Sequence, residues 1–376
     1  MRSLLRQLSL ALTVVALATG LFVGVWSTSA EAVAGKPVAS YVSPERIQFV
    51  SYSKQWDQRK LKALYSELMK NMHGEELAYL GKVILSNESN DEEMGVANMS
   101  YSWTEDDLSD IVMDEPTEIV LYGADQLTTV ESMATTLSHE YGHHFTYYWL
   151  LKKEHKLPSD PTTKWTSIRG IKGQPVVFTD DVEDPDYSHY WDAGEIMADD
   201  YMALFGSPTA KLSMVNSLQT ENGMGFYGEI ENEELPPVTT LAAVRSYWLK
   251  LSGIKDPLPL VFKEPKLQRI ETVKKKDGSV DHKLIFGAGS ANADVASRLQ
   301  YSVYWENEEE ELFDFTDMQT GKQSIVVRGG LPETELTIKV YAYDPKTKQY
   351  VYARPIVYDL SNPYAPALVS PYAQAS

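Results

Sequence analysis

The spacing of apolar residues changes near Lys255-Asp256-Pro257, and this change constrains the fold more than any other feature of the sequence. Before it, stretches such as Tyr52–Met72 place apolar residues at helical spacing. After it, short β-type runs are separated by turns; they cover residues 267–273, 283–286, 301–305, 312–315, 324–327, 336–343 and 350–358. Short strands at such regular intervals are typical of a small β-sandwich.

The chain has 376 residues, which is more than one ordinary core requires, so two folded domains are expected. We predict a multidomain α+β protein with a first domain over residues 33–256, an all-β sandwich over 257–360 and a tail over 361–376. The chain contains no Cys, and the sandwich resembles a fibronectin type III or related immunoglobulin-like module. We expect it to bind a surface or matrix component.

The N-terminus has the layout of a secretory signal peptide. Two Arg residues precede the almost wholly apolar run Leu8–Trp26, and Ala30-x-Ala32 matches a cleavage signal. We therefore predict removal of residues 1–32 and a secreted bacterial protein that does not insert stably into a membrane. An uncleaved membrane anchor is the alternative, because the apolar run is long for a signal peptide.

Charge and composition exclude several classes of partner and chemistry. The net charge of −19 argues against nucleic acid or an anionic membrane surface as the main partner. The lack of Cys excludes disulfides, thiolate metal ligands and a Cys nucleophile.

A helix with two histidines follows the compact strand Glu118–Tyr122. Thr128-x-x-Glu131 has the form of a capping box, and the helix should continue to about Leu151. Within it, His139-Glu140-x-x-His143 places two imidazoles one turn apart on the same face. Such a pair can bind one Zn²⁺, with Glu140 acting as general base on a metal-bound water.

A catalytic zinc site needs a third protein ligand and one open position. A metzincin-type third His is excluded, because Thr146 and Trp149 occupy the positions that this motif requires. On the helix predicted over Asp192–Phe205, Glu195 and Asp199 share one face. We predict that Glu195 binds the metal and that Asp199 accepts the free N–H of a ligand imidazole. The alternative is an acidic helix N-terminus stabilised by the helix dipole.

These motifs resemble the gluzincin metallopeptidases, and Glu195–Phe205 is similar to the anthrax-lethal-factor-like and Pro-Pro-endopeptidase families. The resemblance covers roughly residues 50–220. It implies a zincin-like metallopeptidase domain, with a small sheet, an active-site helix and a helical lower part. It also implies zinc bound by His139, His143 and Glu195, with Glu140 as the base and Asp199 orienting a ligand His.

The chain departs from these families at one position. They carry a catalytic Tyr seven residues before the Glu ligand, where this chain has Ser188. Tyr187, His189 and Tyr190 lie beside it and are the candidates to stabilise an oxyanion. The alternative is that all three only pack or line the loop.

The predicted function is a secreted zinc endopeptidase that acts on a peptide or protein substrate. We expect Glu118–Tyr122 to be the sheet edge along which an extended substrate pairs. One alternative is an inactive zinc-site protein that binds a partner through its β-sandwich; another is a coincidental motif in a helical core. The acidic cluster within residues 180–186 is interpreted as a solvated loop, with a structural Ca²⁺ site as the alternative.

Overall fold

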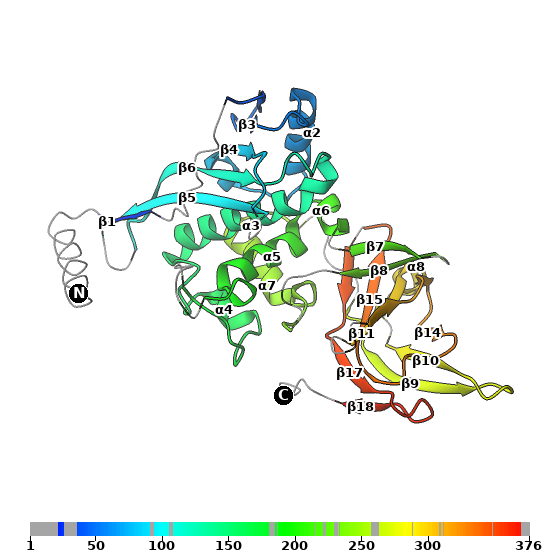
Figure 1. Ribbon diagram of the computed structural model, residues 1–376. Coiled ribbons are helices and arrows are strands. Elements are labelled where there is room, and N and C mark those ends of the chain that lie inside the picture. Colours follow the sequence, from blue (N-terminus) through cyan, green and yellow to red (C-terminus); the bar gives the residue numbers. More distant parts are fainter. Residues whose placement is uncertain are drawn as a thin grey trace, which may run out of the picture. The chain divides into compact units, whose positions relative to one another are not determined.

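The computed structural model divides the chain into two compact units (Figure 1). It describes residues 22–25, 36–90, 94–104, 108–179, 185, 187–213, 215–220, 223–228, 232, 234–256, 263–287, 289–307, 310, 312–347 and 349–369. The first unit comprises Met1–Ser167, Gly173–Ser207 and Trp248–Ile254, and the second comprises Ile168–Lys172, Pro208–Tyr247 and Lys255–Ser376. The mixed α+β, multidomain class is confirmed. Pro208–Tyr247, which we assigned to the first domain, group with the second unit.

A six-stranded mixed sheet forms the scaffold of the first unit. Its order is β1 (Phe22–Val25), β5 (Gly95–Trp103), β6 (Val112–Leu121), β4 (Leu80–Leu85), β3 (Gln48–Ser51) and β2 (Ala39–Val42). Strands β3, β4 and β6 run parallel, whereas β5 folds back antiparallel to β6. Strand β6 is therefore central, paired by β4 and β5, so the prediction that Glu118–Tyr122 forms a sheet edge is wrong.

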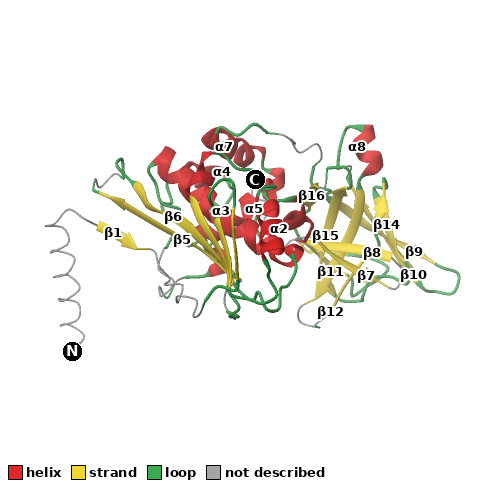
Figure 2. Ribbon diagram, turned by 90° about the horizontal axis from the view of Figure 1, so that it is seen from above, coloured by secondary structure: helices red, strands yellow, loops and turns green. Residues whose placement is uncertain are grey.

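Helices lie along one side of this sheet (Figure 2). They include α2 (Gln58–Leu68), the 3-10 turn η1 (Glu75–Tyr79), α3 (Val130–Glu154), the 3-10 turn η2 (His189–Trp191) and α5 (Ala193–Phe205). The chain also forms α4 (Lys164–Ile168) and α7 (Ala242–Ser252). Every helix in the described part of the chain is too short or too polar to cross a lipid bilayer.

The start of α3 differs from the prediction by one residue. The Thr129 side chain accepts from the Ser132 N–H at 3.1 Å, and the Ser132 side chain accepts from the Thr129 N–H at 3.2 Å. The capping box is thus Thr129/Ser132, not Thr128/Glu131. A Ser at the third helical position can return the hydrogen bond as Glu does.

Two sheets of the second unit share one hydrophobic core. One sheet has the order β14 (Ser324–Val327), β10 (Val280–Phe286), β9 (Leu267–Lys274). The other follows β12 (Leu312–Phe315), β11 (Gln300–Asn307), β15 (Glu335–Asp344), β17 (Ile356–Asp359) and β18 (Ala367–Val369), with β13 (Gln319–Thr320) and β16 (Gln349–Tyr352) at its sides. Buried residues from both sheets, such as Leu284 and Val340, belong to one cluster.

Two details of this unit differ from the sequence prediction. The run predicted over residues 350–358 is split into β16 and β17, with Pro355 between them, because Pro has no N–H to donate to a ladder. Within the segment predicted as a tail, Ala367–Val369 pair with β17.

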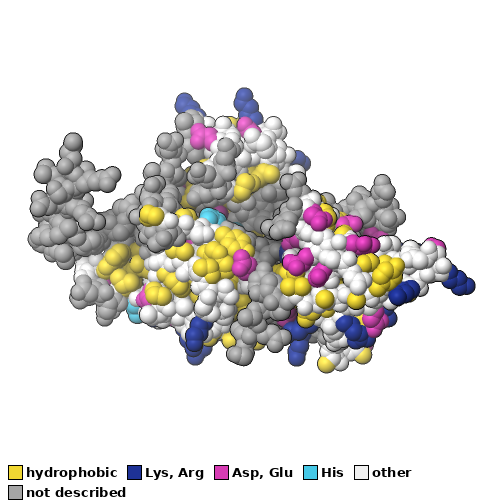
Figure 3. Space-filling model, turned by 60° about the horizontal axis from the view of Figure 1, so that its bottom comes forward, with side chains coloured by type: hydrophobic (Ala, Val, Ile, Leu, Met, Phe, Trp, Pro, Cys, Tyr) yellow, Lys and Arg dark blue, Asp and Glu magenta, His cyan; other side chains and the backbone are white. Residues whose placement is uncertain are grey.

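The second unit also includes α6 (Pro208–Ser213), the hairpin β7 (Val215–Thr220) and β8 (Gly223–Gly228), η3 (Val238–Thr240) and α8 (Ala293–Arg298). Apolar side chains are exposed on both units and contribute to the surface seen in Figure 3. Examples are Val42, Met94 and Phe313, which are more than half exposed.

Candidate metal centre

Helix α3 carries the two histidines of the motif. Their ring centroids lie 4.9 Å apart, as expected for residues one turn apart. Both His143 and Glu140 are buried, with 8% and 5% of their surface exposed. The sequence thus places these polar groups in an interior where each one needs a partner.

Helix α5 supplies the partner of His143, which is Glu195. Asp192 caps it by accepting from the N–H groups of Gly194 at 2.7 Å and Glu195 at 3.0 Å. The helix starts at Ala193, and Glu195 and Asp199, which are one turn apart on it, project from the same face, as predicted.

A glycine allows α5 to approach α3 closely. A Cβ on Gly142 would lie 2.7 Å from the carbonyl oxygen and 3.0 Å from the Cα of Ala198. Side-chain atoms essentially never approach backbone this closely, so only Gly permits the contact. Since Gly142 lies between Glu140 and His143 and Ala198 lies between Glu195 and Asp199, this contact sets the distance between the two halves of the site.

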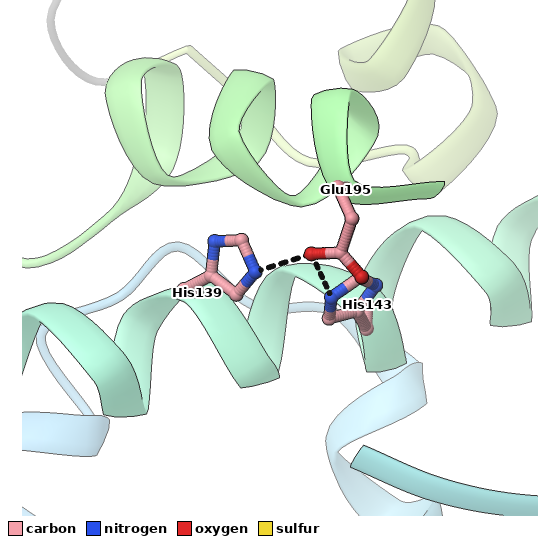
Figure 4. Close-up of side chains that lie close together, drawn as sticks. All are labelled: His139, His143 and Glu195. Atoms are coloured by element: carbon pink, nitrogen blue, oxygen red, sulfur yellow. Dashed lines mark hydrogen bonds and ion pairs between the residues drawn. The ribbon is translucent and has the colours of Figure 1, made fainter. Parts of the chain in front are cut away.

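The predicted ligands converge on one point (Figure 4). Glu195 Oε2 lies 3.0 Å from His139 Nε2 and 3.3 Å from His143 Nε2. One ligand atom from each residue can be chosen so that all three lie within 4.8 Å of one another. The second nitrogen of His139, Nδ1, lies 2.9 Å from Asp199 Oδ1. The group could therefore hold a metal ion, with Asp199 fixing the His139 ring.

The charges of these groups depend on one another. Burial alone would lower the pKa of His139, but hydrogen bonds to Asp199 and Glu195 outweigh it and raise that pKa well above its usual range. Burial would raise the pKa of Glu195, but His143 and His139 hold it well below its usual range. The pKa of His143 is raised, because Glu195 outweighs its burial. A bound cation would replace the protons that the histidines otherwise carry.

Glu140 lies between the ligand group and strand β5. Glu140 and His143 are three positions apart on α3, so the two residues are neighbours on the helix surface. On its other side, Glu140 Oε1 would be 2.7 Å from a Cβ on Gly95. The predicted base therefore lies next to both the ligands and the sheet.

Of the three oxyanion candidates, His189 is brought to the ligand group. Its Nε2 lies 3.5 Å from Glu195 Oε2, and 45% of its side chain is exposed. The Tyr190 ring packs edge-on against Trp191, with centroids 5.3 Å apart. Tyr187 is half-buried and lies just before η2. The acidic residues proposed for Ca²⁺, Asp180, Asp181, Glu183, Asp184 and Asp186, lie outside the described residues.

Sequence reasoning missed a buried network that holds α3 in place. The Glu76 carboxylate is fully buried and accepts from the Gly74 N–H at 2.7 Å, the Tyr141 hydroxyl at 2.8 Å and the Trp149 indole N–H at 2.9 Å. Two of these donors are on α3, so the carboxylate ties the helix to η1. A buried carboxylate that binds three donors cannot be recognised from the sequence, because its donors are up to 73 positions away.

His144, next to the motif, is a structural residue. Its Nε2 lies 2.8 Å from the carbonyl oxygen of Glu76 and its Nδ1 lies 2.8 Å from Thr117 Oγ1. A carbonyl only accepts, so Nε2 carries the proton and Nδ1 accepts from Thr117. Burial lowers the pKa of His144 to about 4, which keeps this imidazole neutral.

Comparisons with known proteins give no family: no protein-family model matches the chain, and no curated protein matches it. The chemistry of the site therefore has to be argued from its own residues.

Proposed function

We propose that the protein is a secreted zinc-dependent endopeptidase of the gluzincin type. The observation that carries this proposal is the convergence of His139, His143 and Glu195, with Glu140 beside them on the same helix. Two imidazoles and one carboxylate are a common ligand set of catalytic zinc and leave one position open. A mixed sheet with α3 against it is consistent with a zincin-like fold.

Zinc fits these donors because they are nitrogen and oxygen atoms. In addition, His139 Nδ1, which would not bind the metal, already has the Asp199 carboxylate as its partner. When bound, zinc would act as a Lewis acid that lowers the pKa of water and polarises a carbonyl group.

The residues of the chain then have separate roles. Glu140 takes a proton from the attacking water and delivers it to the leaving amine. Asp199 holds the His139 ring. His189, exposed beside Glu195, is placed to donate to the oxyanion. We infer these roles from position.

The strand that offers an edge to a substrate is β5 rather than β6. Among the described residues, β1 pairs only with Ser100–Trp103, whereas Gly95 lies beside Glu140. An extended peptide pairing with Gly95–Met99 would pass the base. The remaining parts of the proposal are removal of residues 1–32, which would also remove strand β1, and binding of a surface or matrix component by a fibronectin-III-like second unit.

The test is Glu140→Gln in the full chain. A peptide-library digest read by mass spectrometry should show cleavage by the wild type and none by this variant, while both retain about one zinc per chain. The matched control is Glu131→Gln, which changes an exposed Glu in the first turn of the same helix and should cleave normally.

Other outcomes identify the alternatives. Bound zinc with no cleavage of any peptide by the wild type would support the binding module. A protein without stoichiometric zinc, whose thermal stability is unchanged in chelator, would support a coincidental motif.

A further inference from the structure

Gly95 is the first residue of β5, and its backbone is fixed by the neighbouring strand. It is paired with Leu121 of β6, and the carbonyl of the preceding Met94 accepts from the Tyr122 N–H at 2.9 Å. The position of Gly95 is therefore set by the sheet rather than by α3.

The conformation of the strand does not require glycine at this position. Gly123, a few residues after β6, has a positive φ of 68° that favours glycine, but Gly95 is not one of the positive-φ residues. Glycine also weakens a strand, because it loses more backbone entropy on folding and contributes no side chain. The glycine at position 95 must have another reason, and a common reason for glycine in a strand is the close approach of a neighbouring group.

The neighbouring group is Glu140. A Cβ on Gly95 would lie 2.7 Å from Glu140 Oε1 and 2.9 Å from Glu140 Cγ. It would also lie 2.7 Å from Thr136 Cγ2, one turn earlier on α3. Glu140 is buried, with 5% of its surface exposed.

We propose that Gly95 is a positioning residue for Glu140: the bare backbone of β5 lies against the carboxylate and fixes it beside the metal ligands. This inference rests on the proposed function, in which Glu140 is the base. Any side chain at position 95 would move the carboxylate, because the strand is held by β6 and the helix backbone is held by its own packing. A displaced base would transfer its proton less efficiently, while the metal ligands, whose atoms are not among those nearest to a Cβ at position 95, would keep their positions.

The first experiment compares Gly95→Ala with the wild type, both zinc-loaded, on the best-cleaved peptide of the library. We expect kcat to fall about 10- to 100-fold, the loss that a misplaced catalytic group produces. KM and the zinc Kd should stay within about twofold, since the change affects the transition state and not ground-state binding. An unchanged kcat would overturn the proposal, as would a loss of zinc that accounts for the whole effect.

A second comparison separates displacement of the base from general crowding. Thr136→Ser removes the methyl group that an Ala at position 95 would meet, but leaves the contact with Glu140. Thr136→Ser alone should be as active as the wild type, and Gly95→Ala/Thr136→Ser should be as impaired as Gly95→Ala. Full recovery in the double variant would show that the contact with Thr136 is responsible and would refute the role assigned to Glu140.

A third measurement does not depend on peptidase activity. Acetohydroxamate chelates zinc and donates a hydrogen bond to an adjacent carboxylate, so its affinity reports the position of Glu140. Gly95→Ala should weaken its binding in the wild-type background and have no effect in the Glu140→Gln background. Equal weakening in both backgrounds would overturn the proposal. If the wild type cleaves no peptide, the proposed function fails, and this measurement still decides the role of Gly95.

Discussion

The contact between α3 and α5 at Gly142 gives the most direct test of how the site is built. Gly142→Ala adds one carbon atom, which would lie 2.7 Å from the Ala198 carbonyl oxygen and 3.2 Å from its carbonyl carbon. Ordinary contact distances are about 3.5 Å or more, so the helices must separate by roughly 0.5 Å or more. Backbone atoms cannot move aside as the end of a flexible side chain can.

Two effects on stability oppose each other in this variant. Overpacking costs about 1–3 kcal/mol, whereas the better helix propensity of Ala stabilises α3 by about 1 kcal/mol. The net loss in the free energy of unfolding of the metal-free protein should therefore be about 0–2 kcal/mol. The variant is expected to fold.

The effect on metal binding should be larger, because two ligands lie on α3 and the third lies on α5. Metal–ligand distances tolerate about 0.2 Å, which is less than the separation expected. We predict that the zinc Kd rises about 10- to 100-fold, as when groups that orient metal ligands are disturbed.

The assay is competition of the protein with a fluorescent zinc chelator, combined with urea unfolding of the metal-free protein. Gly287→Ala is the matched control, because its added carbon would meet only the flexible Gln268 side chain, at 3.4 Å. A Gly142→Ala protein that binds zinc as tightly as the wild type would refute the argument that this contact sets the metal geometry.

Three further predictions follow from the other contacts. Asp199→Asn weakens the partner of His139 Nδ1 and should raise the zinc Kd about 10-fold or more in the same competition assay. Zinc at 100 times its Kd should raise the free energy of unfolding by about 2.7 kcal/mol, and chelator should abolish this gain; equal urea midpoints with and without chelator would contradict a native metal site. Burial lowers the pKa of Lys339 from 10.5 to about 8. Between these values the unfolded chain binds the extra proton, so the free energy of unfolding should rise with pH from about 8 by up to about 1.4 kcal/mol per unit. The free energy of unfolding of Lys339→Met, measured in urea titrations, should not rise over this pH range. An equal pH dependence in both proteins would disprove the prediction.

The local parts of the candidate site could be predicted from the sequence. His139, Glu140 and His143 lie on one helix, and the i, i+4 pairing of Glu195 and Asp199 follows from helix geometry alone. The structure brings these two helices together, as the ligand prediction required. In the second unit, most strands coincide with the predicted apolar runs, because alternation along a strand is a local signal.

Features that depend on pairing between distant segments could not be predicted. The apolar run at Glu118–Tyr122 indicates a strand but not its neighbours, and β5 pairs with it on the side that we expected to be open. The roles of Gly95 and Gly142 depend on atoms of other elements, and nothing in their own sequence neighbourhood indicates a close contact. A glycine inside the predicted helix was the available signal at position 142, whereas position 95 offered none.

The division of the ligands between α3 and α5 also has a consequence for the order of events during folding. A chain folded only through α3 offers the two imidazole ligands without the carboxylate ligand, which lies 52 positions after His143. Uptake of zinc at native affinity must wait until α5 has docked against α3. The time at which a refolding chain binds zinc at native affinity therefore reports when α5 has docked against α3.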